Sequence, residues 1–456
     1  MPRKFNFEID EKTPLLKIAG PLFFEMLLTT LLHSVDTLML SHYNELAVGA
    51  VGNVSQVMAM LGLFFGIISL ATSVVVAQYL GAKQFAKMNR IYTLAVIVNL
   101  AVGIVLCGAV VALAPRIMAW LNVSDEMRPF ALTYIRIVGA GMFMQAVYRV
   151  MSQILRCNGF TKIGLYVSIG MNAVNIGGNY LFLYGALKHL GLGVAGVAIS
   201  TVVANAVALV IAFHFFFSRR IGRLSLRYLR PFPLELLWQM VKIGLPSAGE
   251  QLSYNFYQMC LLAFINKMGN DAVNAKIYCY SLIHFAFLFA NAAAMGTQII
   301  VGHLVGAGKE EEAYSRVFRT LRISMPITLA ITLANWLLSP WTLRWFTANE
   351  AIVAMSWWLM FVDIFIEAGR CLNLTFIYSL RAAGSYVFPL IIGLATMWGI
   401  GLTLGYGLGV AAGIGVAGVF IGTAADECVR GLVVMYYWWR RKWSGKALVE
   451  KGRIAS

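Results

Sequence analysis

The chain has 456 residues, of which 60% are hydrophobic and only 12% are charged, and its formal net charge is +16. A water-soluble domain carries about 25% charged residues, so the composition excludes an ordinary soluble protein and predicts an all-α integral membrane protein. The positive charge lies mostly between the apolar segments, on alternate connections. This distribution follows the positive-inside rule and excludes a nucleic-acid-binding surface.

Twelve apolar segments are long enough to cross a bilayer, which takes about 20 residues in an α-helix. In chain order they cover 17–41, 47–79, 91–113, 130–154, 163–186, 193–217, 239–266, 272–304, 320–340, 351–379, 386–407 and 414–438. Several exceed the length that a bilayer requires, so we expect them to tilt or to extend into water.

The second half of the chain repeats the first. Residues that recur at a constant separation of 225 positions include Glu25 and Glu250, Gly81 and Gly306, and Arg156 and Arg381. The glycine pair follows the second segment of each half, so each half holds six spans and both halves have the same orientation. We therefore predict two six-helix bundles related by a pseudo-two-fold axis along the membrane normal.

A basic segment with two prolines joins the halves, and it sets the predicted domain boundaries. We predict an N-lobe at 1–217, a cytoplasmic linker at 218–238, and a C-lobe at 239–456 that ends in a cytoplasmic tail. Because linker and tail are rich in Lys and Arg, we expect both termini to be cytoplasmic, in the inner (plasma) membrane. The basic segments are expected to contact anionic lipids of that membrane.

The first apolar segment carries two acidic residues, Glu25 and Asp36, and is too long for a signal peptide, so we expect it to remain as the first span. Asp36 has no Lys or Arg within a helical turn. Eleven residues are close to three turns, so both carboxylates share a face, about 16 Å apart. An ionisable residue at mid-helix costs about 2.5–3.5 kcal/mol, so by default it faces the bundle interior. Asp36 can carry a proton or ligate a cation with neutral oxygens; alternatively, it pairs with an arginine.

Polar residues of the fifth and sixth segments are candidates for those neutral oxygens. Asn175 and Asn179 are four residues apart, on one face of the fifth helix, and Thr201 lies in the sixth. Such a stripe either holds helices together through hydrogen bonds or offers amide oxygens to a cation beside Asp36. With Asp36, these three residues form the predicted cation-coupling site.

The second half has its own acidic residues, which with Glu25 form a secondary acidic set: Glu250, Asp363 and Glu367. Glu367 and Arg370 are three residues apart and are expected to pair, leaving Asp363 as the freer acid. The segment around Glu250 is unusually polar, so some of its side chains should line a water-accessible cavity. The candidates for a substrate cavity are Tyr254, Asn255, Gln258 and Phe287.

The sequence lacks the motifs that catalysis or ATP hydrolysis would need. It has no Gly-x-Ser-x-Gly, no His-Glu-x-x-His and no Walker Gly-x-x-x-x-Gly-Lys-Ser/Thr. The six cysteines are scattered, without a Cys-x-x-Cys pair. We therefore expect no enzyme, no structural metal and no cofactor, and energy that comes from an ion gradient unless transport is passive.

The order and spacing of several motifs resemble the multidrug and toxic compound extrusion (MATE) family of secondary transporters over nearly the whole chain. The motifs are Val35-Asp36, Ala-Val-Gly-Ala-Val-Gly-Asn at 47–53, Leu-Arg-Cys-Asn-Gly at 155–159, Gly-Val-Ala-Gly-Val-Ala-Ile-Ser-Thr at 193–201 and Glu-Ala-Gly-Arg-Cys-Leu-Asn at 367–373. The resemblance implies export of organic, often cationic, drugs driven by entry of Na⁺ or H⁺. It also implies that Asp36 is the coupling acid of the first helix.

Branches of that family differ in the acidic residues that their helices carry in addition to the one in the first helix. One has a fifth-helix aspartate at the place that Asn179 takes here, and another uses a seventh-helix glutamate and a tenth-helix aspartate, for which Glu250 and Asp363 are the nearest matches. We predict a cation-coupled antiporter of small organic cations that works by alternating access and needs no oligomer. The alternatives are a lipid-linked-oligosaccharide flippase of the same broad superfamily and, in a different class, a membrane-embedded enzyme or receptor.

Overall fold

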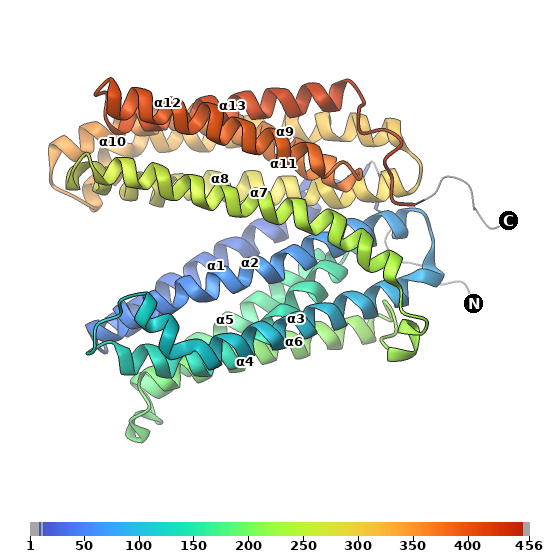
Figure 1. The fold of residues 1–456 in the computed structure, drawn as a ribbon, viewed down its shortest axis with the longest axis horizontal. Coiled ribbons are helices and arrows are strands. Elements are labelled where there is room, and N and C mark those ends of the chain that lie inside the picture. Colours follow the sequence, from blue (N-terminus) through green and yellow to red (C-terminus); the bar gives the residue numbers. More distant parts are fainter. Residues whose placement is uncertain (1–8, 11, 450–456) are drawn as a thin grey trace. The chain divides into compact units, whose positions relative to one another are not determined.

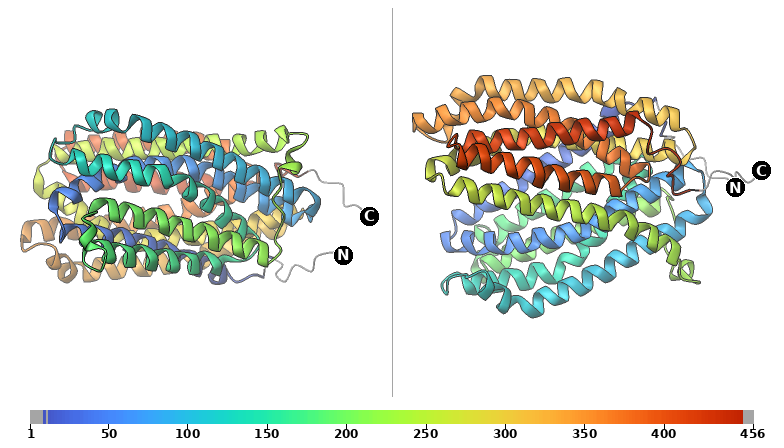
Figure 2. Two further views of the ribbon diagram at one scale, coloured as in Figure 1. Left: turned by 90° about the horizontal axis from the view of Figure 1, so that it is seen from below. Right: turned by 45° about the horizontal axis from the view of Figure 1, so that its top comes forward.

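The computed structural model describes residues 9, 10 and 12–449, with the backbone alone at His33 and Glu45. Within these residues all regular structure is helical, and the long helices run side by side within each bundle (Figures 1 and 2). The first six spans are α1 (Leu15–Ser41), α2 (Glu45–Gly81), α3 (Phe85–Trp120), α4 (Arg128–Cys157), α5 (Thr161–Leu183) and α6 (Val194–Ser218). A short 3₁₀ turn, η1 (Lys188–Leu190), lies between α5 and α6.

The second six spans follow in the same order. They are α7 (Leu234–Asn266), α8 (Asn270–Gly306), α9 (Glu310–Thr342), α10 (Glu350–Ala382), a composite span from Val387 to Ala411, and α13 (Val416–Trp439). The composite span consists of α11 (Val387–Thr396) and α12 (Thr403–Tyr406) with π-helical segments at Met397–Leu402 and Gly407–Ala411. The predicted all-α class with twelve spans in two six-helix bundles is therefore confirmed.

By their internal contacts the described residues form two compact units. The first contains Phe24–Leu80 and Gln84–Gly244, and the second contains Ile9–Phe23, Gly81–Lys83 and the chain from Leu245 onward. The division falls inside α7, whereas the sequence places the linker at 218–238. That segment contains the 3₁₀ turn η2 (Leu226–Leu229) and packs on α3, since Asn89 Oδ1 accepts a hydrogen bond from the Arg223 backbone N–H at 2.8 Å.

The beginning of α1 packs within the second unit. Arg316 of α9 donates a hydrogen bond from Nη1 to the carbonyl oxygen of Thr13 at 2.7 Å. Leu15 and Ala19 form a small buried cluster with Ala293 of α8. In the same way, the first residues of α7, up to Gly244, belong to the first unit. Each of the two helices that open a bundle therefore has residues in both units.

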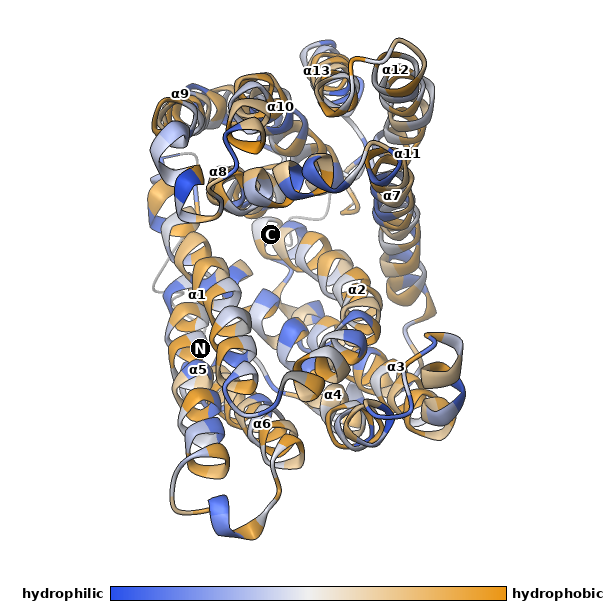
Figure 3. Ribbon diagram, turned by 90° about the vertical axis from the view of Figure 1, so that its left-hand side faces the viewer, coloured by the Kyte–Doolittle hydropathy of each residue, from blue (hydrophilic) through white to orange (hydrophobic). Residues whose placement is uncertain are grey.

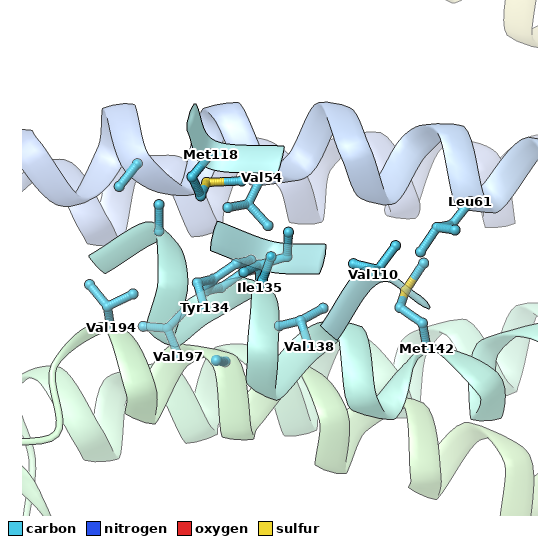
Figure 4. Packing of buried hydrophobic residues seen from close by; sticks show 14 of the residues in the cluster. Val54, Leu61, Val110, Met118, Tyr134, Ile135, Val138, Met142, Val194 and Val197 are labelled. Atoms are coloured by element: carbon cyan, nitrogen blue, oxygen red, sulfur yellow. The ribbon is translucent and has the colours of Figure 1, made fainter. Parts of the chain in front are cut away.

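Each unit has an apolar core of its own, and the outer faces of the helices are also apolar. In the first unit, Val54 of α2, Ile135 and Val138 of α4, and Val197 of α6 pack together (Figure 4). Hydrophobic residues also make up most of the length of the helices (Figure 3). Large apolar side chains on the outside suit contact with lipid rather than water.

Nine of the described helices are long and apolar enough to cross a membrane by length and composition. The long helices that fall short are α5, α7 and α13. Each carries an unusual number of polar residues, such as Asn175 and Asn179 in α5, Glu250 in α7 and Asp426 and Glu427 in α13. All five are buried. These helices are therefore less hydrophobic than the others because they carry polar groups that face the protein interior.

Glycines let the composite span approach α13 closely. A Cβ atom on Gly422 would lie 2.5 Å from the backbone nitrogen of Gly405, and one on Gly418 would lie 2.6 Å from that of Gly409. Small residues at such a crossing bring two backbones into van der Waals contact. The glycines at 405, 409, 418 and 422 therefore serve the packing of these two helices.

We predict that Gly422→Ala destabilises the second unit by about 1–3 kcal/mol, because the new methyl group would overlap backbone atoms of the composite span. The measurement is the temperature of half-denaturation of the purified protein in detergent. The matched control is Gly399→Ala, since a Cβ at Gly399 would meet no atom within 4 Å. Equal melting temperatures for the two variants would contradict the close packing.

Candidate functional site

Asp36 of α1 faces the interior of the first bundle and meets α5. Asn179 donates a hydrogen bond from Nδ2 to Asp36 Oδ1 at 2.7 Å. Asn179 is fully buried, whereas Asp36 is half-buried. The structure therefore places the predicted coupling acid beside its predicted amide neighbour.

The hydrogen bonds continue from Asn179 into α6. Asn179 Nδ2 also donates to Asn175 Oδ1 at 3.1 Å, and Asn175 Nδ2 donates to Thr201 Oγ1 at 3.2 Å. Thr201 in turn donates to the carbonyl oxygen of Val197 at 3.0 Å. All four predicted cation-coupling residues thus form one continuous chain of polar groups across α1, α5 and α6.

Tyr134 of α4 lies beside this chain of polar groups and was not predicted. Its hydroxyl lies near Thr201, and its ring is buried in the core of the first unit. A tyrosine in an apolar helix gives no sequence signal that separates this position from ordinary packing. Only the arrangement of α4 beside α6 shows the contact.

The chain of polar groups supplies oxygen atoms and has no positive charge. Asn179 Oδ1 is buried and has no hydrogen-bond partner, and Asp36 enters none of the ion pairs that the described side chains form. In particular, Arg136 is exposed and does not pair with it. Carboxylate and amide oxygens are ligands for hard cations, and the carboxylate alone can take a proton.

The predicted secondary acids Glu25 and Glu250 form ion pairs that repeat between the halves. Arg156 Nη2 lies 2.5 Å from Glu25 Oε1, and Arg381 Nη2 lies 2.7 Å from Glu250 Oε2. All four side chains are largely buried. The constant separation of 225 residues in both the acids and the arginines was the signal that could have revealed these pairs. Each pair holds the first helix of its bundle to the fourth, which is a structural role.

The other acids of the second unit belong to a network between α10 and α13. Arg370 pairs with Glu367 and, through Nε, with Glu427 Oε1 at 3.4 Å. Arg430 Nη2 lies 2.7 Å from Asp426 Oδ2 and 3.5 Å from Glu427 Oε2. The pair expected between Glu367 and Arg370 is present, but Glu427 joins both arginines into one buried network.

Asp363 lies one turn from Glu367 on α10 and stays outside that network. It is 4% exposed and enters none of the hydrogen bonds or ion pairs of the described side chains. Glu250 is held separately by Arg381. The structure therefore divides the predicted secondary set, with each glutamate in an ion pair with an arginine and Asp363 in none of the ion pairs of the described side chains.

The predicted substrate-cavity residues occupy different surroundings. Gln258 donates from Nε2 to the hydroxyl of Tyr254 at 3.1 Å, and the guanidinium of Arg370 lies 5.6 Å from the ring centre of Phe287. Asn255 is exposed. The structure thus joins Tyr254 with Gln258 but does not gather all four residues.

Gln258 also lines a small cavity together with Lys276 and Thr423. The cavity measures about 10 Å³, which is room for a single water molecule. Lys276 lies two turns inside α8 and places its ammonium group 5.3 Å from the ring centre of Tyr280. Sequence reasoning passed over this intramembrane lysine, although its charge within an apolar segment was a visible signal.

A family model described as MatE matches residues 21–181 and 246–407. The chain belongs to the MATE family. It is 35% identical over 444 residues to the "Uncharacterized transporter YisQ" of Bacillus subtilis (strain 168), which covers 97% of this chain and 96% of that protein. It is 22% identical over 440 residues to a "Probable multidrug resistance protein NorM" of Thermotoga maritima, at 96% and 95% coverage.

Solved structures have the same fold. A crystal structure of a MATE protein in the bent conformation matches with a TM-score of 0.88 at 20% identity and covers 95% of both chains. An outward-facing multidrug resistance MATE transporter matches with a TM-score of 0.86 at 20% identity, covering 95% of this chain and 96% of that one. As a MATE protein, the chain is a multi-pass membrane transporter and not an enzyme.

We predict that Glu250→Gln lowers the stability of this MATE transporter by about 3–5 kcal/mol, because it leaves the charge of Arg381 buried and unpaired. The change is measured as a fall in the melting temperature in detergent. The double variant Glu250→Gln/Arg381→Gln should recover most of the loss, since no unpaired charge remains. A single variant as stable as the unmodified protein would contradict the structural role of the pair.

Proposed function

We propose that the protein exports organic cations from the cell in exchange for Na⁺ or H⁺, and that Asp36 binds the coupling ion. The observation that carries the proposal is the hydrogen-bonded chain from Asp36 through Asn179 and Asn175 to Thr201. The chain offers a negative charge and neutral oxygens inside an apolar bundle. Multidrug resistance proteins among the relatives, such as the NorM of Thermotoga maritima, support the export of drugs.

The hydrogen bond to Asp36 couples ion binding to helix packing. The deprotonated carboxylate accepts the hydrogen bond of Asn179, which holds α1 against α5. A proton or a Na⁺ ion on the carboxylate competes with that amide donor and therefore favours a different arrangement of the two helices. If the organic cation binds preferentially to the arrangement without the ion, each ligand displaces the other, and the exchange is obligatory.

The alternative of a lipid-linked-oligosaccharide flippase receives less support. That function calls for a basic cleft and is often associated with fourteen spans, whereas this chain has twelve. The buried arginines Arg370 and Arg430 are both neutralised by glutamate or aspartate. Of the two relatives named above, one is printed as a probable multidrug resistance protein and the other as an uncharacterized transporter, and neither name refers to an oligosaccharide.

The remaining parts of the proposal concern the setting of the transporter. We place it in the inner membrane of a bacterial cell, with both termini in the cytoplasm, because the basic linker and tail follow the positive-inside rule. Anionic lipids contact these segments. The transporter acts as a monomer on small organic molecules and needs neither a cofactor nor a nucleic acid.

We predict that Asp36→Asn abolishes cation-driven efflux, because an amide can neither carry the proton nor supply the charge for Na⁺. The measurement is efflux of a fluorescent organic cation from proteoliposomes, under a pH gradient alone and then under a sodium gradient alone. The control is Asp125→Asn, which removes an exposed carboxylate in a loop. Undiminished efflux by the Asp36 variant under either gradient would rule out Asp36 as the coupling residue.

We predict that Asn179→Ala weakens coupling without abolishing it. The variant removes a hydrogen bond to a charged group, which contributes about 1.5–3 kcal/mol, so the ion concentration at half-maximal efflux should shift about ten- to hundredfold. If only the sodium dependence of efflux shifts, the Asn179 oxygen is a ligand of Na⁺. If the pH dependence of efflux shifts, the coupling ion is the proton. No shift in either would contradict the proposed site.

A further inference from the structure

A groove lies where the beginning of α9 meets the end of α13, both in the second unit. Its volume is about 390 Å³, within the range of about 300–1,000 Å³ that is typical of ligand sites. Its lining consists of Tyr314, Ser315, Phe318, Arg319, Arg322 and Trp439. We call these residues the α9–α13 groove. It contains none of the residues of the proposed transport site.

The floor of the groove is a set of aromatic side chains packed on one another. Phe318 lies 5.2 Å from Tyr314 and 5.6 Å from Phe376 of α10, measured between ring centres. Trp438 is fully buried and stacks on Trp443 at 4.1 Å. Its indole N–H donates to the carbonyl oxygen of Tyr314 at 3.5 Å. These contacts fix the ends of α9 and α13 relative to each other, so the groove is preformed.

Two arginines of the groove lie on the same face of α9, and two acids near them form ion pairs with other residues. Arg319 and Arg322 are three residues apart on α9 and both are exposed, so they share a face. Glu311 pairs with Arg441, and Glu312 pairs with Lys309. Arg322 enters none of the ion pairs that the described side chains form. Arg322 therefore presents a positive charge that no acid among the described side chains neutralises.

The position of the arginines along α9 matches a membrane boundary. From 323 to 342 the helix has 20 residues without a charge, which span about 30 Å, the thickness of the hydrocarbon core. Arg322 is the last charged residue before that run, and Arg319 lies about 4.5 Å further out. Trp439 ends α13, is 55% exposed and is followed by Arg440 and Arg441. Tryptophan and arginine in this order are typical of the headgroup level.

We propose that the α9–α13 groove binds the headgroup of an anionic phospholipid. The phosphate accepts hydrogen bonds from Arg319 and Arg322, whose planar guanidinium groups suit phosphate oxygens. An acyl chain then runs along Phe318 and the exposed face of Trp439 into the membrane. A water-soluble phosphate compound fits less well, because the groove opens at the boundary of the hydrocarbon core. The proposal goes beyond the transport function and is independent of it.

The test measures lipid binding by the full-length protein in neutral detergent, without substrate or ion gradient. Native mass spectrometry with added phosphatidylglycerol should show one retained lipid, and phosphatidylcholine should be retained far less. Arg322→Gln should lower the apparent affinity for phosphatidylglycerol about fivefold, as expected for one basic residue at an anionic headgroup. Trp439→Ala should also weaken retention while leaving the charge unchanged.

The matched control is Arg227→Gln, which removes one exposed charge from the linker, outside the groove. It should bind phosphatidylglycerol as the unmodified protein does. Equal losses for Arg322→Gln and Arg227→Gln would indicate unspecific attraction and overturn the proposal, as would equal retention of both lipids. Displacement of the lipid by inorganic phosphate at equal concentration would assign the groove to a soluble anion and also overturn it. Because no transport is measured, failure here leaves the exchange mechanism unaffected.

Discussion

The proposed exchange mechanism depends on the hydrogen bond between Asn179 and Asp36. A carboxylate at mid-helix is costly in a membrane, and here a buried amide and the chain behind it make it tolerable. The same bond joins α1 to α5, so the carboxylate that we propose as the ion site also holds two helices together. In the proposed mechanism, an ion that binds to Asp36 therefore also changes how the two helices pack.

The two halves share their framework but differ in their polar interiors. The ion pair of Glu25 and Arg156 recurs in the second half, whereas the position 225 residues after Asp36 is Leu261, a member of the second core. Conversely, the position 225 residues before Asp363 is Val138, in the first core. The repeated ion pairs stabilise each bundle, whereas the acids Asp36 and Asp363 occur in only one half each and distinguish the two bundles.

The sequence was sufficient to predict the spans, their duplication and the neighbours of Asp36. Hydropathy and helical spacing are local patterns, and the duplication is visible when the two halves are compared residue by residue. It did not reveal Arg156 as the partner of Glu25, nor Glu427 between Arg370 and Arg430. Such contacts depend on how each helix is rotated against its neighbour, which spacing within one helix does not determine. The ends of the spans also differed: α3 runs over Phe85–Trp120, beyond the predicted 91–113, because a helix continues in water where charges are tolerated.

The central claim is that Asp36 holds an ion which the transported compound displaces. The most direct measurement adds an organic cation to the purified protein in weakly buffered detergent solution and records the release of H⁺ or Na⁺. The account predicts release from the unmodified protein and none from the Asp36→Asn variant. Equal release from both proteins would show that the ion is bound elsewhere and would contradict the account.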